Sequence, residues 1–223
     1  AFLNFDESLE KLNQHLLSGQ SVRDAVGGDN GVRLMDLNTD GYQDVVIGNG
    51  LTRLTRVWEP TSKTWKESGL PVDLITSARL ETGVKFGCLG ETKKVTMVVR
   101  TERFEGAWSY SEEGWVPMPA IIRELRVNNE FVWTRQGGRD TGVRMRDLNG
   151  DGQTELIGGD RAGGQVIKWS EAEQTWMPTG YSLPKGISVV NEEGLDNGVR
   201  FVDINGDGFD DLIVGANEAD PGS

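Results

Sequence analysis

Three nine-residue segments of this 223-residue chain repeat one pattern of oxygen-bearing side chains. They read DLNTDGYQD from Asp36, DLNGDGQTE from Asp147 and DINGDGFDD from Asp203. Each places Asp, Asn and Asp at positions one, three and five, a glycine at position six and a carboxylate at position nine. Calcium takes about six to eight oxygen ligands, which a loop of alternating oxygen-bearing residues can supply. The pattern therefore predicts calcium-binding loops.

These loops are not EF-hand loops, although an EF-hand loop opens with the same pattern. That motif needs a glutamate at position twelve, where this chain has Ile47, Gly158 and Val214. Position seven varies in chemistry, as expected if only its backbone carbonyl binds the ion. The predicted ligands therefore lie at positions one, three, five, seven and nine. They are Asp36, Asn38, Asp40, Tyr42 and Asp44; Asp147, Asn149, Asp151, Gln153 and Glu155; and Asp203, Asn205, Asp207, Phe209 and Asp211.

The residues on either side of each loop predict strands rather than helices. The loops follow GVRLMDL, GVRMRDL or GVRFVDI, and they run into DVVIG, ELIGG or DLIVG. Short runs rich in Val, Ile and Leu and bounded by glycine are typical of strands. One Asp/Asn/Gly-rich segment alone could equally be a solvated turn. Three copies between matching strands favour a calcium loop that joins two strands.

A longer repeat contains each loop. GVRL at Gly31, GVKF at Gly83, GVRM at Gly142 and GVRF at Gly198 lie 52, 59 and 56 residues apart. Tryptophans seven residues apart follow the first three starts, and strands joined by a four-residue turn would place their rings opposite one another. The pairs are Trp58 with Trp65, Trp108 with Trp115, and Trp169 with Trp176. We interpret them as core, although a sugar-binding or quinone-stacking surface is the alternative.

The repeat predicts an all-β fold. Two strands around the loop and two around the tryptophan turn make about four antiparallel strands, the size of one β-propeller blade. The chain would then hold three complete repeats and a partial fourth, starting near residues 29, 81, 140 and 196. An acid and a base four residues apart mark each start, and we interpret them as ion pairs, or alternatively as a polar ring lining a central channel. They are Asp29 with Arg33, Glu81 with Lys85, Asp140 with Arg144, and Asp196 with Arg200.

The second repeat departs from the calcium pattern. Its loop reads CLGETKKVT from Cys88, with Gly90 and Thr92 in place of the Asn and Asp, and Lys93 in place of the glycine. We expect this loop to bind no calcium. Lys93 and Lys94 either bring positive charge to where the ion would lie or are ordinary surface lysines.

Over about residues 21 to 217 the chain resembles the FG-GAP and VCBS type repeats of β-propellers, which also form the heads of integrin α-chains. The resemblance rests on the three loops and their flanking strands. It implies calcium ligands at positions one, three, five and nine of each loop. More weakly, GLDNGVRFVDINGDGFDDLI resembles repeats of large secreted proteins of planctomycete-type bacteria, where such propellers accompany c-type haem modules. No CxxCH occurs in this chain, so no haem site can be placed.

Composition favours a protein outside the cytoplasm. Lys and Arg number 23 and Asp and Glu 35, and the net charge of -12 disfavours nucleic acid or an anionic membrane surface as partner. Three calcium ions would bring -12 to -6. Loops with few carboxylates suit the extracellular affinity range of about 10⁻⁴ to 10⁻³ M. We therefore expect a secreted or periplasmic protein without membrane insertion, and a chain that begins inside a longer precursor.

The two ends depart from the repeat. Residues 1–20 predict a linker helix, capped by Asp6 and with an apolar stripe of Leu9, Leu12 and Leu16. Residues 21–223 form the repeat segment. Its fourth repeat stops before a tryptophan turn, so we expect part of a larger propeller, with a small four-bladed ring as the alternative.

Catalysis has little support in the sequence. His15 is the only histidine and Cys88 the only cysteine, and the two lie far apart along the chain. We therefore predict no enzyme but a scaffold or interaction module, which binds other domains of its own polypeptide, a protein or a glycan. A lectin-like propeller is one alternative. A non-catalytic part of a secreted oxidoreductase or lyase is the other.

Overall fold

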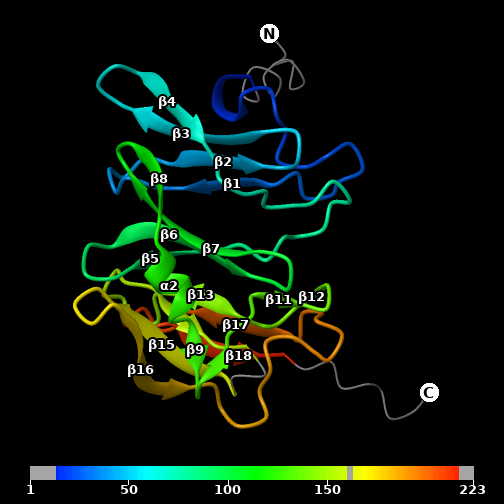
Figure 1. Cartoon of the computed structure of the whole chain (residues 1–223), viewed down its shortest axis with the longest axis vertical. Helices are drawn as coiled ribbons and strands as arrows, with labels where there is room; N and C mark the ends of the chain where they lie inside the picture. The colour runs from blue at the N-terminus through cyan, green and yellow to red at the C-terminus, as the bar shows by residue number, and fades with distance from the viewer. Residues whose placement is uncertain (1–13, 160–162, 216–223) are drawn as a thin grey trace. The chain divides into compact units, whose positions relative to one another are not determined.

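The computed structural model describes residues 14–159 and 163–215. The chain divides into two compact units, residues 1–82 with 111–115 and residues 83–110 with 116–223. Within the described residues the fold is dominated by small antiparallel sheets, each built from strands that are consecutive in the chain (Figure 1). The prediction of an all-β fold is confirmed.

Three four-stranded sheets correspond to the three complete repeats, and a two-stranded sheet to the fourth. The first sheet holds β1 (Val32–Met35), β2 (Asp44–Gly48), β3 (Arg53–Glu59) and β4 (Thr64–Gly69). The second holds β5 (Lys85–Leu89), β6 (Lys94–Arg100), β7 (Glu105–Ser111) and β8 (Gly114–Pro117). The third holds β13 (Arg144–Arg146), β14 (Glu155–Ile157), β15 (Gln165–Ser170) and β16 (Thr175–Ser182), and the last holds β17 (Val199–Val202) and β18 (Asp211–Val214).

The loop patterns connect the first two strands of their sheets, as predicted. In the first repeat Val32 pairs with Ile47 and Met35 with Asp44. The second strand is central, and every residue of β2 is buried. Burial on both faces explains why DVVIG reads as a continuous apolar run rather than an alternating one.

The glycine at each GVR start allows a close backbone approach. Gly31 has φ +67°, a left-handed conformation, and a Cβ there would collide with the carbonyl oxygen of Gly48. The two residues are joined by a 2.9 Å hydrogen bond from Gly48 N to Gly31 O. Gly198 and Gly215 repeat this arrangement with a 3.0 Å bond. The recurring glycine is therefore a steric requirement of the repeat.

The tryptophan pairs lie opposite one another in the first and third sheets. Trp58 pairs with Trp65 at a ring separation of 5.1 Å, and Trp169 with Trp176 at 5.7 Å. Trp169 and Trp176 belong to the largest apolar cluster, and Trp176 Nε1 donates to Ile121 O at 2.9 Å. The burial of Trp169 and Trp176 supports the interpretation of that pair as core, whereas Trp58 and Trp65 are half-buried.

The tryptophans of the second sheet have other partners. Only two residues separate β7 from β8, instead of the four between β3 and β4. The ring of Trp108 stacks on Phe104 at 5.8 Å, and Trp115 Nε1 donates to Thr55 Oγ1 at 2.8 Å.

The expected ion pairs form within three of the repeats. The three pairs are Arg33 with Asp29 at 2.7 Å, Arg144 with Asp140 at 2.9 Å and Arg200 with Asp196 at 2.7 Å. In the second repeat Lys85 Nζ lies 3.8 Å from Asp140, the acid of the third repeat.

A short turn that was not predicted from the sequence precedes the first, second and fourth repeats. Its ends form the bridges Arg23 with Asp29, Ile75 with Glu81, and Val190 with Asp196. A polar side chain at the start of the turn accepts backbone N–H bonds inside it: Asp24 from Val26 and Gly28, Thr76 from Leu80, and Asn191 from Glu193 and Leu195. Such side chains commonly stabilise turns in this way.

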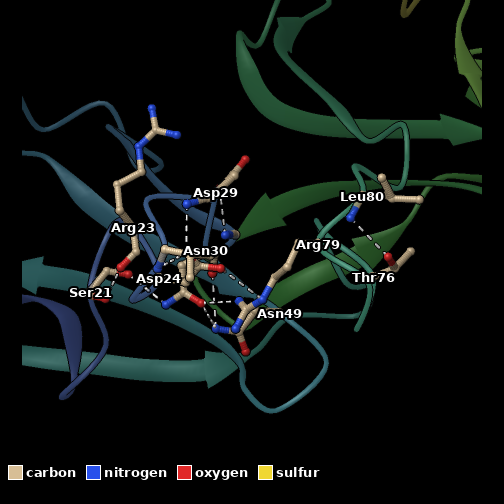
Figure 2. Close-up of polar contacts among 12 residues, drawn as sticks. Ser21, Arg23, Asp24, Asp29, Asn30, Asn49, Thr76, Arg79 and Leu80 are labelled. Atoms are coloured by element: carbon tan, nitrogen blue, oxygen red, sulfur yellow. Dashed lines mark hydrogen bonds and ion pairs between the residues drawn. The ribbon is translucent and has the colours of Figure 1, made fainter.

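Figure 2 shows the polar contacts around the first two of these turns. Arg79 NH1 donates to Asn30 Oδ1 at 2.6 Å, and its Nε lies 3.4 Å from the carboxylate of Asp24. Asn49 Nδ2 donates to Asn30 O at 3.1 Å. Arg79 has φ +62°, which costs a non-glycine residue about 1 kcal/mol or more. Its contacts link the turn before the second repeat to the turn before the first.

The longest spacing, between the second and third repeats, contains an insertion. It comprises α2 (Pro119–Arg123), β9 (Arg126–Val127), β10 (Glu130–Phe131), β11 (Arg135–Gln136) and β12 (Arg139–Asp140). Arg100 at the end of β6 is 1% exposed and donates to Leu125 O at 2.7 Å and to Ile122 O. Its guanidinium is also 2.8 Å from Glu105. The buried charge therefore joins β6 both to the insertion and to β7.

Backbone hydrogen bonds join a repeat to the segment that opens the next. Leu74 N donates to Gly48 O at 2.9 Å, and Thr134 N donates to Arg100 O at 3.1 Å. Gly48 and Arg100 both lie four residues after position nine of their loops. The same joint therefore recurs although its side chains differ.

The predicted linker helix is described only in its last turn. Residues 14–17 are helical, whereas Asp6, Leu9 and Leu12 lie outside the described residues. Leu17 is buried with Val32 and other residues of the first sheet, and Leu16 packs against the same cluster.

We predict that Trp176→Ala will lower the free energy of unfolding by about 3–5 kcal/mol, because it removes a buried ring and its hydrogen bond to the chain. Urea denaturation measures this loss. Trp58→Ala is the matched control, since Trp58 is only half-buried and should cost less. Equal losses at the two positions would contradict burial as the cause.

Candidate metal sites

The first loop gathers the side chains of positions one, three and five. Asp36 Oδ2 accepts a 2.8 Å bond from the backbone N–H of Gly41, and Asp40 Oδ1 accepts one of 2.9 Å from Tyr42. Asn38 Nδ2 donates to Asp40 Oδ2 at 2.9 Å. Three oxygen-bearing side chains are thus held on one loop by its own backbone.

The other two loops repeat these bonds. Position one accepts from position six, position three donates to position five, and position five accepts from position seven. The glycines at position six have φ between +82° and +88° in all three loops. The bonds are Gly152 to Asp147 at 2.8 Å, Asn149 to Asp151 at 3.2 Å and Gln153 to Asp151 at 2.7 Å; and Gly208 to Asp203, Asn205 to Asp207 and Phe209 to Asp207, each at 2.9 Å.

Position nine is placed differently from the other predicted ligands. Asp44 is completely buried, and its two oxygens accept 2.8 Å bonds from the backbone N–H groups of Leu37 and Trp58. The bond from Leu37, at position two of the loop, recurs in the other two loops. Glu155 accepts from Leu148 N at 2.9 Å, and Asp211 accepts from Ile204 N at 3.0 Å. Position nine therefore closes the base of each loop through the backbone, a role that the sequence analysis missed.

Within the described ranges, no three His, Cys, Asp or Glu side chains are grouped so that they could hold a metal ion. The structure brings together positions one, three and five, of which one is an asparagine. It does not add the carboxylate of position nine to them. Whether the predicted ligands bind calcium stays a prediction.

Burial raises the pKa of Asp44 and of Glu155, and the nearby carboxylates of positions one and five raise both values further. The bonds from the backbone N–H groups oppose this rise. In the third loop, by contrast, the bond from Gly208 lowers the pKa of Asp203. The first two loops thus concentrate negative charge that a cation would offset.

One buried oxygen gives a direct test of fit for such a cation. Asp147 Oδ1 is buried and has no hydrogen-bond partner among the described residues, whereas Asp147 Oδ2 accepts from Gly152. A buried carboxylate oxygen without a partner is costly. Carboxylate, amide and carbonyl oxygens are the ligands that calcium prefers. The residues of loop 147–155 therefore fit a calcium ion.

The loop of the second repeat has other residues at the predicted ligand positions, and that it binds no calcium stays a prediction. This loop spans residues 88–96, and Cys88 N donates to Thr154 Oγ1 at 2.9 Å. His15 is exposed, and its carbonyl accepts from Arg56.

The comparison with protein families identifies one segment. Residues 147–214 match the model of the FG-GAP-like repeat. This segment spans the second calcium-loop pattern, β14 to β18 and the third pattern, and the match supports an FG-GAP-type repeat in this part of the chain. No curated protein gave a match, and nothing supports the resemblance to planctomycete-type proteins. Among the described residues no helix has the length and apolarity needed to cross a membrane.

We predict that Asp44→Ala will lower the free energy of unfolding by about 2–4 kcal/mol even in EDTA, because two backbone N–H groups lose their acceptor. Urea denaturation in EDTA measures the loss. Asp40→Ala, on the exposed part of the same loop, should change stability by less than about 1 kcal/mol under these conditions. If both variants unfold like the parent in EDTA, the structural role of position nine is wrong.

Proposed function

We propose that this chain is a calcium-stabilised β-propeller segment that serves as a scaffold or interaction module outside the cytoplasm. The observation that carries the proposal is the unpaired, buried Asp147 Oδ1 within a loop of oxygen-bearing side chains. The recurrence of the same loop in three repeats supports it.

The repeat supports the proposed propeller architecture. Each complete repeat forms a four-stranded antiparallel sheet from consecutive strands, as propeller blades do. The FG-GAP-like match over residues 147–214 supports the same assignment. The two-stranded β17–β18 sheet would be the inner half of a further blade.

Calcium would act on the junction between the first two strands of a blade. Positions one, three and five and the carbonyl of position seven would hold it, while position nine keeps the loop closed through the backbone. A bound ion would offset the repulsion among the loop carboxylates. Its contribution would be to stabilise the hairpin rather than to perform chemistry.

The location outside the cytoplasm follows from the expected affinity. Few carboxylates surround each site, which suits the millimolar calcium of secreted and periplasmic proteins. The net charge of -12 would still leave an acidic surface after three ions bind. We therefore propose a protein partner or neighbouring domains, and no nucleic acid.

Calcium should raise the melting temperature of the chain. At a free concentration about one hundred times the dissociation constant, each site adds roughly 2.7 kcal/mol to stability. Scanning calorimetry in 10 mM calcium and in EDTA measures the shift. The variant Asp36→Ala/Asp147→Ala/Asp203→Ala should melt at one temperature in both buffers. A parent protein with equal melting temperatures in the two buffers would overturn the proposal.

A cavity favours glycan binding as a second candidate function. It has a volume of about 330 Å³ and is lined by Tyr181, Phe209, Asn149 and Asp210 as well as by aliphatic residues. Tyr181 and Phe209 are 67% and 54% exposed. Exposed rings with amide and carboxylate groups beside them are suited to stack on and hydrogen-bond to a sugar.

If this candidate is correct, a glycan array in calcium will give hits that Tyr181→Ala reduces at least tenfold. Tyr110→Phe is the control, since Tyr110 is buried and does not line this cavity. An array without hits in calcium would reject the lectin-like function and leave the scaffold proposal standing.

A further inference from the structure

Loop 147–155 has a loop of another repeat on each of its two sides. On one side Thr154 N donates to Cys88 O at 2.7 Å, in the loop that lacks the calcium pattern. On the other side Asp210 N donates to Leu148 O at 3.1 Å, from the third calcium-pattern loop. All three loops belong to the same compact unit. The middle loop therefore experiences the charges of both neighbours.

Lys93 brings a positive charge to this middle loop. Its ammonium donates a hydrogen bond to the backbone carbonyl of Asp151, the residue at position five. Lys93 stands where the other loops have glycine and keeps the left-handed conformation of that position, with φ +52°. The side chain of this left-handed residue reaches the neighbouring loop.

The contact distinguishes loop 147–155 from the other two calcium-pattern loops. A Cβ built on Gly152 would lie 2.5 Å from Lys93 Nζ. A Cβ built on Gly41 or Gly208, the equivalent glycines, would meet no atom within 4 Å. Among the three calcium-pattern loops, all of which the structure describes, only loop 147–155 has a lysine against its sixth position.

We propose that Lys93 acts as a built-in cation that weakens calcium binding to loop 147–155 and so makes the three calcium sites unequal. The inference rests on the proposed function, since it presumes that the loops bind calcium. A fixed ammonium group repels an incoming divalent cation, and at separations of about 8 to 10 Å in water the effect is roughly fivefold in affinity. Salt screens this repulsion.

The same charge holds the loop in the absence of calcium. The ammonium draws the carbonyl of position five toward the second repeat and reduces the repulsion between Asp147 and Asp151. The second repeat, whose loop lacks the calcium pattern, thus supplies a positive charge to the calcium-pattern loop of the third repeat. The middle site should fill last as calcium rises.

The position-six amides provide one reporter for each loop. Gly41, Gly152 and Gly208 donate to the position-one carboxylates at 2.8, 2.8 and 2.9 Å, so their NMR signals respond to calcium in their own loop. Titration of the whole chain with calcium chloride at low ionic strength gives three midpoints. We expect Gly152 to have the highest.

Three variants separate charge from packing. Lys93→Met keeps the length of the side chain and should lower the Gly152 midpoint roughly fivefold at low salt, with the Gly41 midpoint unchanged. Lys93→Arg keeps the charge and should leave the Gly152 midpoint near that of the parent. Lys94→Met removes the adjacent exposed charge at the start of β6 and should leave all three midpoints in place. The effect of Lys93→Met should shrink at 0.5 M sodium chloride.

Each outcome decides the inference. If calcium shifts all three amides but Lys93→Met leaves the Gly152 midpoint unchanged, the role of Lys93 is wrong and the proposed function stands. If Lys93→Arg shifts that midpoint as much as Lys93→Met does, the effect is not one of charge and the inference is wrong. If calcium shifts none of the amides, the proposed function and the inference both fail.

Discussion

The bond between the carboxylate of position nine and the N–H group of position two underlies the repeated unit. It occurs in all three calcium-pattern loops and joins the end of the first strand to the start of the second. In the first repeat the same carboxylate also accepts from Trp58 on the third strand, so one buried side chain connects three strands. Burying a charge is tolerable only when its oxygens are bonded, and here the backbone provides the partners.

Because position nine serves the backbone, the loop does not depend wholly on an ion for its shape. The second repeat has a different residue at position nine. Its position nine is Thr96, whose hydroxyl bonds with that of Ser109 at 2.7 Å on the third strand. A neutral pair thus replaces the carboxylate, and the four-stranded sheet still forms.

Much of the fold could be predicted from local patterns. The strands beside the loops, the pairing of Trp58 with Trp65 and the Asp29–Arg33 ion pair depend on residues close in the chain, so their spacing reveals them. The grouping of positions one, three and five was predictable for the same reason. The bonds that Asp44 accepts from the backbone were not predicted, because spacing cannot show which backbone N–H group a side chain will meet.

Contacts over longer separations could not be predicted. Arg100 reads as a surface residue, yet the insertion buries it by supplying two carbonyl acceptors from residues more than twenty positions away. Lys93 reads as a solvated charge, and only the neighbouring loop gives it a partner. In both cases backbone carbonyls are among the partners, and they leave no trace in side-chain composition.

The joint between repeats has a consequence for how such a chain can change in evolution. The bonds from Leu74 to Gly48 and from Thr134 to Arg100 join main-chain atoms, so the same joint forms with a glycine in one repeat and an arginine in the next. The residues at the joint can therefore diverge between repeats while the main-chain bond is kept. Arg100 is an example, because its backbone forms the joint while its side chain binds the insertion.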